Sequence, residues 1–177
     1  MRQRFLVPVI LAALALSACS TPPITTPTVE STVTMNQIVP GMPDTPMPVL
    51  VPPAGPFDLP ALGIDVPANA RSVTLSSAIL HLDVRNQMKI PLSLGIFLGG
   101  DRDQVYDAAN LLGEVEIAPE QTGRIDQNVK DPTLFKAEKV WVGIRFRTAG
   151  SNGKLVTVQG SDAIVIGASA TVQVKLF

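Results

Sequence analysis

Apolar and polar side chains alternate with a period of two along four stretches of the chain. Because side chains at positions i and i+2 share one face of a strand, each stretch predicts a strand that buries one face. The first two stretches are separated by a turn at residues 86–91 and together predict a hairpin. The apolar members are Ala78, Leu80, Leu82 and Val84; Leu92, Leu94, Ile96 and Leu98; Val140, Val142, Ile144 and Phe146; and Ala170, Val172, Val174 and Leu176.

Weaker patterns complete the predicted fold. Glycine-containing turns separate shorter strands at residues 63–66, 72–75, 114–117, 124–129, 155–159 and 163–166. Two short helical turns are expected, at residues 131–138 and 107–112. About 7–9 short, one-sided strands predict an all-β fold, an immunoglobulin-like antiparallel β-sandwich over residues 61–177. The sandwich would fold without disulfides, because Cys19 is the sole cysteine.

Residues 19–60 have a different composition, rich in proline and threonine. Proline fixes φ and removes an amide donor, so this segment predicts a disordered, extended tether. At about 3.1 Å per residue, roughly 40 residues would reach about 120 Å when fully extended. One alternative stays open: Val49, Leu50, Val51 and Phe57 are apolar enough to dock as an edge strand. The folded domain would then begin nearer residue 48.

The first residues follow the order of a secretory signal peptide, predicted at residues 1–18. Arg2 and Arg4 precede an apolar run of about 12 residues, which is shorter than the roughly 20 that a membrane-spanning helix needs. The ending Leu16-Ser17-Ala18-Cys19 resembles the lipobox of bacterial lipoproteins. That resemblance implies cleavage before Cys19, lipidation of its sulfur, and a membrane anchor in the cell envelope. It further implies the outer membrane if the source has two membranes, because Ser20 rather than aspartate follows the cysteine.

A second resemblance covers residues 80–98, LHLDVRNQMKIPLSLGIFL. A strand, an asparagine, a short turn with proline and a second strand are similar to the LEA14/WHy (water-stress and hypersensitive-response) domain. Gln87 stands where that family usually has proline. The resemblance implies a sandwich associated with stress protection or membrane interaction rather than catalysis.

Charge and side-chain chemistry exclude several classes of function. Residues 61–177 hold 12 basic and 12 acidic side chains, whereas a nucleic-acid binder normally has a basic excess. His81 is the only histidine and is predicted to point outward on the same strand face as Asp83. Such a pair could orient Ser77 or Ser93 as a nucleophile, but neither serine lies in a G-x-S-x-G motif. No enzyme is therefore expected. No cofactor is expected either, and one histidine with one lipidated cysteine cannot ligate zinc or copper.

A weak calcium site is one interpretation of the loop after Gly99 and Gly100. Asp101, Asp103 and Asp107 supply carboxylates there, and Ca²⁺ takes six to eight oxygen ligands from flexible loops. Arg102 would oppose the ion. The alternative is a hydrated loop in which Asp107 caps a short helix.

Trp141, Arg145 and Arg147 alternate with the apolar residues of their strand and are predicted to form an outward stripe. An aromatic and cationic stripe suits contact with a protein, a glycan or lipid headgroups. Alternatively, Trp141 lies flat over Gly143 and the arginines solvate the sheet.

Together these features predict a lipid-anchored cell-envelope protein whose sandwich binds or supports another envelope component, either a protein or a glycan. The membrane would be reached through the lipid on Cys19, and no oligomeric state is predicted. The alternative function is a carrier or sensor of a small ligand or lipid, with LEA14/WHy-like stress protection as one form of it.

Overall fold

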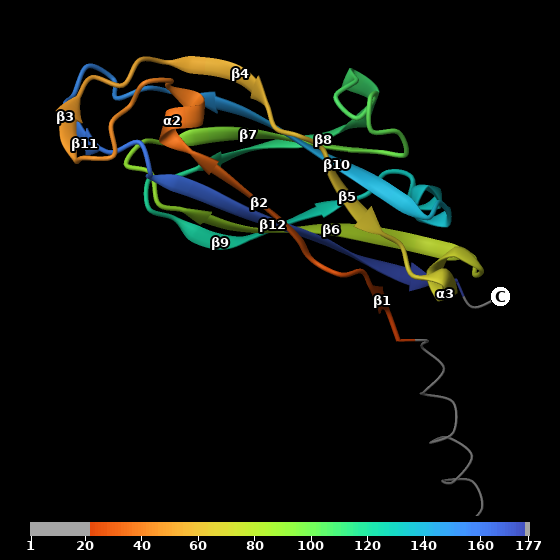
Figure 1. Cartoon of the computed structure of the whole chain (residues 1–177). Coiled ribbons are helices and arrows are strands. Elements are labelled where there is room, and N and C mark those ends of the chain that lie inside the picture. The colour runs from red at the N-terminus through yellow and green to blue at the C-terminus, as the bar shows by residue number, and fades with distance from the viewer. Residues whose placement is uncertain (1–21, 176–177) are drawn as a thin grey trace, which may run out of the picture.

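The fold is a β-sandwich, seen in a computed structural model that describes residues 22–175. Two five-stranded antiparallel sheets enclose a hydrophobic core, and a separate two-stranded ribbon lies at one end (Figure 1). The predicted all-β antiparallel sandwich is confirmed. The predicted signal peptide and Cys19 lie outside the described residues. Within residues 22–175 no helix is long and apolar enough to cross a bilayer.

Sheet I has the strand order β1-β12-β6-β9, and β2 also pairs with β12. β1 and β2 follow one another along the same side of β12, whose other side pairs with β6. β12 is continuous where the sequence predicted two strands, at residues 163–166 and 170–176. The strands are β1 (Ile24–Thr25), β2 (Val29–Thr34), β6 (Leu75–Asn86), β9 (Thr122–Asn128) and β12 (Ala163–Val174).

Sheet II has the order β4-β10-β7-β8, with β5 also paired to β10. Its strands are β4 (Ala54–Asp58), β5 (Leu62–Asp65), β7 (Leu92–Gly99), β8 (Leu111–Ile117) and β10 (Lys139–Thr148). The ribbon pairs β3 (Met47–Val49) with β11 (Val156–Val158). The helical segments are all short: α2 (Met35–Ile38), α3 (Ala68–Arg71), η1 (Ala108–Asn110) and η2 (Pro132–Lys136).

The core forms where the alternating patterns predicted it. Inward side chains of β6, β7, β10 and β12 are almost fully buried, and Phe135 and Phe146 are the largest among the fully buried residues. Each fully buried side chain of this kind stabilises the fold by about 1.5–3 kcal/mol. The predicted helical turn after Asp131 is also present: Asp131 Oδ1 accepts the N–H of Thr133 at 2.9 Å. The hydrogen bond from the Thr133 hydroxyl, followed by that from the Thr133 N–H, lowers the pKa of Asp131.

The predicted hairpin between residues 78–85 and 92–98 is wrong. β6 belongs to sheet I and β7 to sheet II, so the connection crosses from one sheet to the other. Met88 and Ile90 in that connection are both buried in the core. A hairpin turn would have exposed these two side chains to water. Asn86 shapes the crossing, because its Oδ1 accepts the N–H of Met88 at 3.0 Å and its Nδ2 donates to the Ala118 carbonyl at 2.8 Å.

The predicted tether and the boundary at residue 61 do not hold for residues 22–60. This segment forms β1 to β4 and α2, which raises the strand count in the described residues to twelve. The prolines are compatible with the sheets because an edge strand donates hydrogen bonds on only one side. The segment is also bound to the core, where it contributes Val33, Met35, Val51 and Leu59. The alternative of a docked strand near residues 49–51 is correct, because β3 and β4 belong to the fold. It did not include residues 22–46, which form β1, β2 and α2.

Candidate functional site

Trp141 lies on the outer face of sheet II, opposite the buried Val142, as the alternation predicted. Its ring lies against Gly63 on β5, where a Cβ atom would be only 3.0 Å from ring atom Cζ3. The side chains of Arg102 and Lys139 each approach the ring centroid at 5.6 Å. Trp141 is thus half-buried and already in contact with two cations of its own chain.

Arg145 is committed to contacts inside the protein. Its guanidinium donates two hydrogen bonds to Asp58, at 2.5 and 2.9 Å. The same group lies 5.0 Å from the Phe97 ring centroid and 5.4 Å from that of Tyr106. The hydrogen bond to Asp58 raises the pKa of Arg145. The predicted stripe is therefore interrupted at its centre by a structural arginine.

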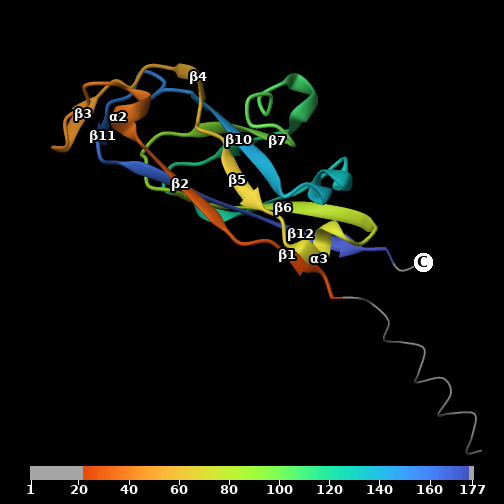
Figure 2. The same cartoon turned by 45° about the vertical axis from the view of Figure 1, so that its right-hand side comes forward.

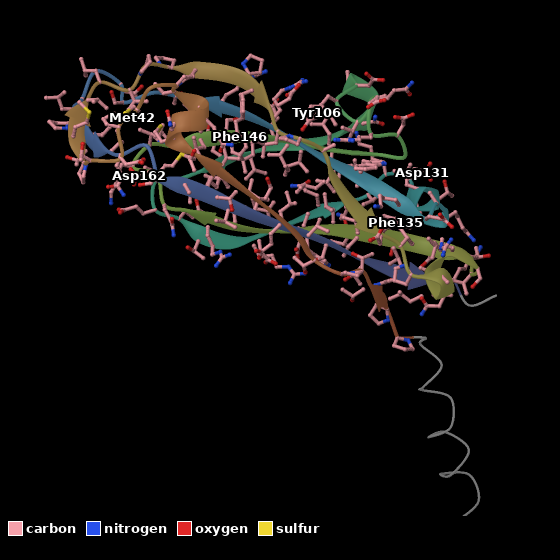
Figure 3. The ribbon with its side chains drawn as sticks, viewed as in Figure 1. Met42, Tyr106, Asp131, Phe135, Phe146 and Asp162 are labelled. Carbon is pink, nitrogen blue, oxygen red and sulfur yellow. The ribbon has the colours of Figure 1, made fainter. Side chains whose placement is uncertain are left out.

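Tyr106 explains this arrangement, and no pattern in the sequence predicted its position. Its ring covers Gly143, where the sequence predicted Trp141, and a Cβ atom there would be 2.8 Å from ring atom Cε1. The hydroxyl donates to the Leu59 carbonyl at 2.5 Å and accepts the N–H of Ile144 at 3.0 Å. The hydroxyl thereby joins β10 to the segment between β4 and β5. Burial raises the pKa of Tyr106. Figure 3 labels this residue, which lies on the outer side of β10.

Arg147 is the exposed member of the predicted stripe, and it lies between two surface hollows. The hollow of 230 Å³ is lined by residues that include Gly55 and Phe57. The hollow of 350 Å³ lies on the other side, beside Ser93 and Glu116. Both open at the surface rather than between the sheets. They leave Arg147 accessible to a partner without forming an enclosed ligand cavity.

His81 is buried, at 7% exposure, which corrects the prediction of an exposed residue beside Asp83. Its partner is Asp126, directly opposite on β9, with Nδ1 and Oδ1 2.7 Å apart. Its Nε2 lies 2.8 Å from the Thr171 hydroxyl. The hydrogen bond from His81, followed by that from Arg124, lowers the pKa of Asp126.

The order Asp126, His81, Thr171 is one that can activate a hydroxyl for nucleophilic attack. Here, however, Thr171 stands within β12, paired on one side with Thr25 and on the other with Ile79. The backbone at Thr171 thus belongs to two antiparallel ladders. The hydrogen bonds of Asp126, His81 and Thr171 join β9, β6 and β12 through side chains. The hydroxyl of Thr25 on β1 lies 3.5 Å from that of Thr171.

The calcium interpretation of Asp101, Asp103 and Asp107 is not supported. Among the described residues, no three His, Cys, Asp or Glu side chains are close enough to hold a metal ion. The N–H of Asp103 donates to Asp101 Oδ1 at 2.8 Å, so that carboxylate closes the turn itself. Asp107 precedes η1 without a capping hydrogen bond from its side chain.

Three large apolar side chains are exposed in the part of the chain that the structure describes, and all lie on or beside the β3–β11 ribbon. They are Met47 at 37%, Leu50 at 59% and Leu155 at 68% exposure. We call these three residues the apolar tip. Figures 1 and 2 show that the ribbon is at the end of the sandwich opposite β1. The sequence predicted Leu50 only as part of a strand that docks onto the domain, and Leu50 is exposed instead.

No family model and no curated protein sequence matches this chain. Several solved structures are similar at a low level, three of which follow. Latent aurone synthase, a polyphenol oxidase, has a TM-score of 0.37 and 12% identity, covering 82% of this chain and 26% of that one. Infectious bursal disease virus, Gx strain, has a TM-score of 0.36 and 15% identity, covering 98% and 36%. The K1 cleaved adhesin domain of Lys-gingipain from Porphyromonas gingivalis W83 has a TM-score of 0.36 and 10% identity, covering 88% and 100%.

This chain thus spans about a quarter of the first of these proteins and about a third of the second. With TM-scores below 0.5, none of the three likenesses supports a functional argument.

Proposed function

We propose that this protein is a lipid-anchored component of the cell envelope whose β-sandwich binds another envelope protein through the apolar tip. The observation that carries the proposal is the position of Leu50, Leu155 and Met47. They are the exposed large apolar residues of the described chain, and they gather at one end rather than being scattered. Apolar side chains that gather on an otherwise polar surface favour a protein interface.

The chemistry of the tip favours a protein partner over a glycan. Its residues are aliphatic or thioether side chains, which bind by burying apolar area and offer no hydrogen bonds to sugar hydroxyls. The face around Trp141 and Arg147 is the competing surface, and a glycan or an anionic group would suit it better. Arg145 adds little there, because Asp58 already occupies its guanidinium.

The proposal is for binding rather than for catalysis or ligand transport. Its support is that the two hollows beside Arg147 are open at the surface, and that the space between the sheets is filled by one cluster of apolar side chains. An enclosed apolar groove would have favoured the carrier function instead.

The test compares a tip variant, Leu50→Ser/Leu155→Ser, with a face variant, Trp141→Ala/Arg147→Ala. Because Leu50 and Leu155 are exposed, the tip variant should melt within a few degrees of the wild type. The partner is identified by crosslinking in envelopes and purified. The tip variant should then bind it at least about tenfold more weakly, while the face variant should bind normally.

The reverse result would move the binding site to the Trp141 face. Equal binding by all three proteins would overturn both locations. The anchor is tested separately: Cys19→Ser should abolish incorporation of labelled fatty acid, and continued labelling would exclude Cys19 as the lipidated residue.

A further inference from the structure

The described part of the chain pairs with sheet I from Ile24, five residues after Cys19 in the sequence. Ile24 and Thr25 pair with Val172 and Thr171 on β12. Thr26 completes the attachment: its N–H donates to the Ala170 carbonyl at 2.8 Å, and its hydroxyl accepts the N–H of Ala170 at 2.8 Å. The side chain of Thr26 is buried. The sandwich therefore begins at residue 24 and not near residue 61.

This position changes the reach of a lipid on Cys19. The five residues from Cys19 to Ile24 span at most about 18 Å, since an extended chain covers about 3.6 Å per residue. A tether of roughly 40 residues would have allowed about 120 Å. A protein anchored at Cys19 consequently holds the β1 end of its sandwich within a short distance of the lipid headgroups.

We infer that the β1 end of the sandwich rests on the membrane and contacts anionic lipid headgroups, with the apolar tip directed away from the bilayer. The β1 end consists of β1, α3, η2 and the end of β12, which Figures 1 and 2 show grouped together. This inference rests on the proposed lipidation of Cys19.

The charges at the β1 end suit an anionic surface. Residues 65–75, 128–139 and 173–175 contain Arg71, Lys130, Lys136, Lys139 and Lys175 against Asp65, Asp131 and Glu138. Two of these carboxylates are paired, Glu138 with Arg71 at 3.1 Å and Asp65 with Lys139 at 3.2 Å. Lys136 and Lys175 are exposed and form no ion pair within residues 22–175, and the ammonium group of Lys136 donates to the Val73 carbonyl. Their attraction to headgroups acts within a Debye length of about 8–10 Å, which the short link allows.

The carboxylates beside the β1 end are largely partnered. Residues 22–34 carry Glu30 as their single charged side chain, and Glu30 lies 3.7 Å from Arg85. The loop with Asp101, Asp103 and Asp107 lies next to η2, since a Cβ atom on Gly100 would be 3.8 Å from the Leu134 side chain. In that loop Asp101 accepts the N–H of Asp103. The attraction to headgroups is therefore assigned to the exposed lysines of the β1 end itself.

The orientation is testable by energy transfer, because Cys19 is the sole native cysteine and its sulfur would carry lipid. Thr74→Cys places one dye at the β1 end, and Thr45→Cys places one before β3 near the apolar tip; both threonines are exposed. β12 has 12 residues and measures about 36 Å at about 3.3 Å per residue, which sets the expected difference in depth. Lipidated protein is reconstituted in vesicles of phosphatidylglycerol and phosphatidylethanolamine that carry a headgroup acceptor.

Transfer from residue 74 should be severalfold higher than from residue 45, and a long glycine–serine insert after Ser20 should abolish the difference. Equal transfer from both positions, or higher transfer from residue 45, would overturn the orientation. Mass spectrometry of the same sample reports lipidation. Protein whose Cys19 carries no lipid in this measurement would refute the proposed anchor, whereas lipidated protein with equal transfer would refute only this inference.

Anionic headgroups are tested with Lys136→Glu/Lys175→Glu, after thermal melting has confirmed the fold. Transfer from residue 74 should fall on anionic vesicles and stay unchanged on phosphatidylcholine. Added salt should reduce the wild-type signal on anionic vesicles in the same way, without any substitution. If neither the variant nor salt changes the signal, lipid charge has no part in the contact.

Discussion

Residues 22–60 and residues 61–175 build the same sandwich by different means. The second region supplies the long strands at the centre of each sheet, such as β6 and β12 with 12 residues each. The first supplies short strands of two to six residues, and β1, β2 and β4 all lie at sheet edges. The difference teaches that a proline-rich composition does not by itself indicate a tether. An edge strand tolerates proline, and a few apolar side chains are enough to attach it.

The largest effect should come from removing the first region altogether. A fragment of residues 61–177 loses Val33, Met35, Val51 and Leu59 from the core. At about 1.5–3 kcal/mol each, their loss costs about 6–12 kcal/mol, against a typical total stability of about 5–15 kcal/mol. We expect the fragment to show no cooperative unfolding in urea, whereas a fragment of residues 22–177 should unfold cooperatively. A fully cooperative 61–177 fragment would restore the tether interpretation.

A single buried position sharpens the comparison. Val33 on β2 is as deeply buried as Val142 on β10, although it lies in the proline-rich region. Val33→Asp should therefore destabilise the protein by several kcal/mol, because it buries a carboxylate without a partner. Thr32→Asp is the matched control, since Thr32 is exposed on the same strand. Thermal melts that show the same small change for both variants would mean that β2 does not contribute to the core.

A smaller effect is expected where the two regions are joined by Tyr106. Tyr106→Phe removes the hydrogen bonds to Leu59 and Ile144 and should cost about 1–3 kcal/mol at neutral pH. Since burial raises the pKa of Tyr106 in the folded state, its contribution is present below pH 10 and is lost as the pH rises through the folded-state value. The free energies of unfolding of the wild type and the variant should therefore converge above pH 10.

Tyr106 is the sole tyrosine, so its ionisation can be followed directly by ultraviolet absorbance. A constant difference between wild type and variant from pH 7 to pH 11 would contradict the proposed role of the buried hydroxyl.

The sequence predicted the central strands because each buries one face and exposes the other. It could not predict which strands pair, because alternation is the same whether a strand's neighbour is the next one along the chain or a distant one. The false hairpin between residues 78–85 and 92–98 shows this limit. Met88 and Ile90 were a usable signal, because two apolar residues in a short turn indicate a connection through the core.

The candidate site was predicted in part. The outward direction of Trp141 and Arg147 followed from the alternation. The commitment of Arg145 to Asp58, and of His81 to Asp126, did not, because each partner lies on a different strand and far away in the sequence. Gly143 indicated that an aromatic ring lies over β10, but only the fold places Tyr106 there. The apolar tip depends on how β3 meets β11, which no local pattern contains.

The pairing of β12 with β1 and β2 has a consequence for how the protein folds. Thr26 and Ala170 are 144 residues apart in sequence, and β2 likewise finds its partner only in β12. Contacts of such long sequence separation slow folding, because a large loop must close before they form. The first strands to be synthesised must therefore remain unpaired until the last one is available. Sheet I cannot be completed until nearly the whole polypeptide, including β12, has been synthesised.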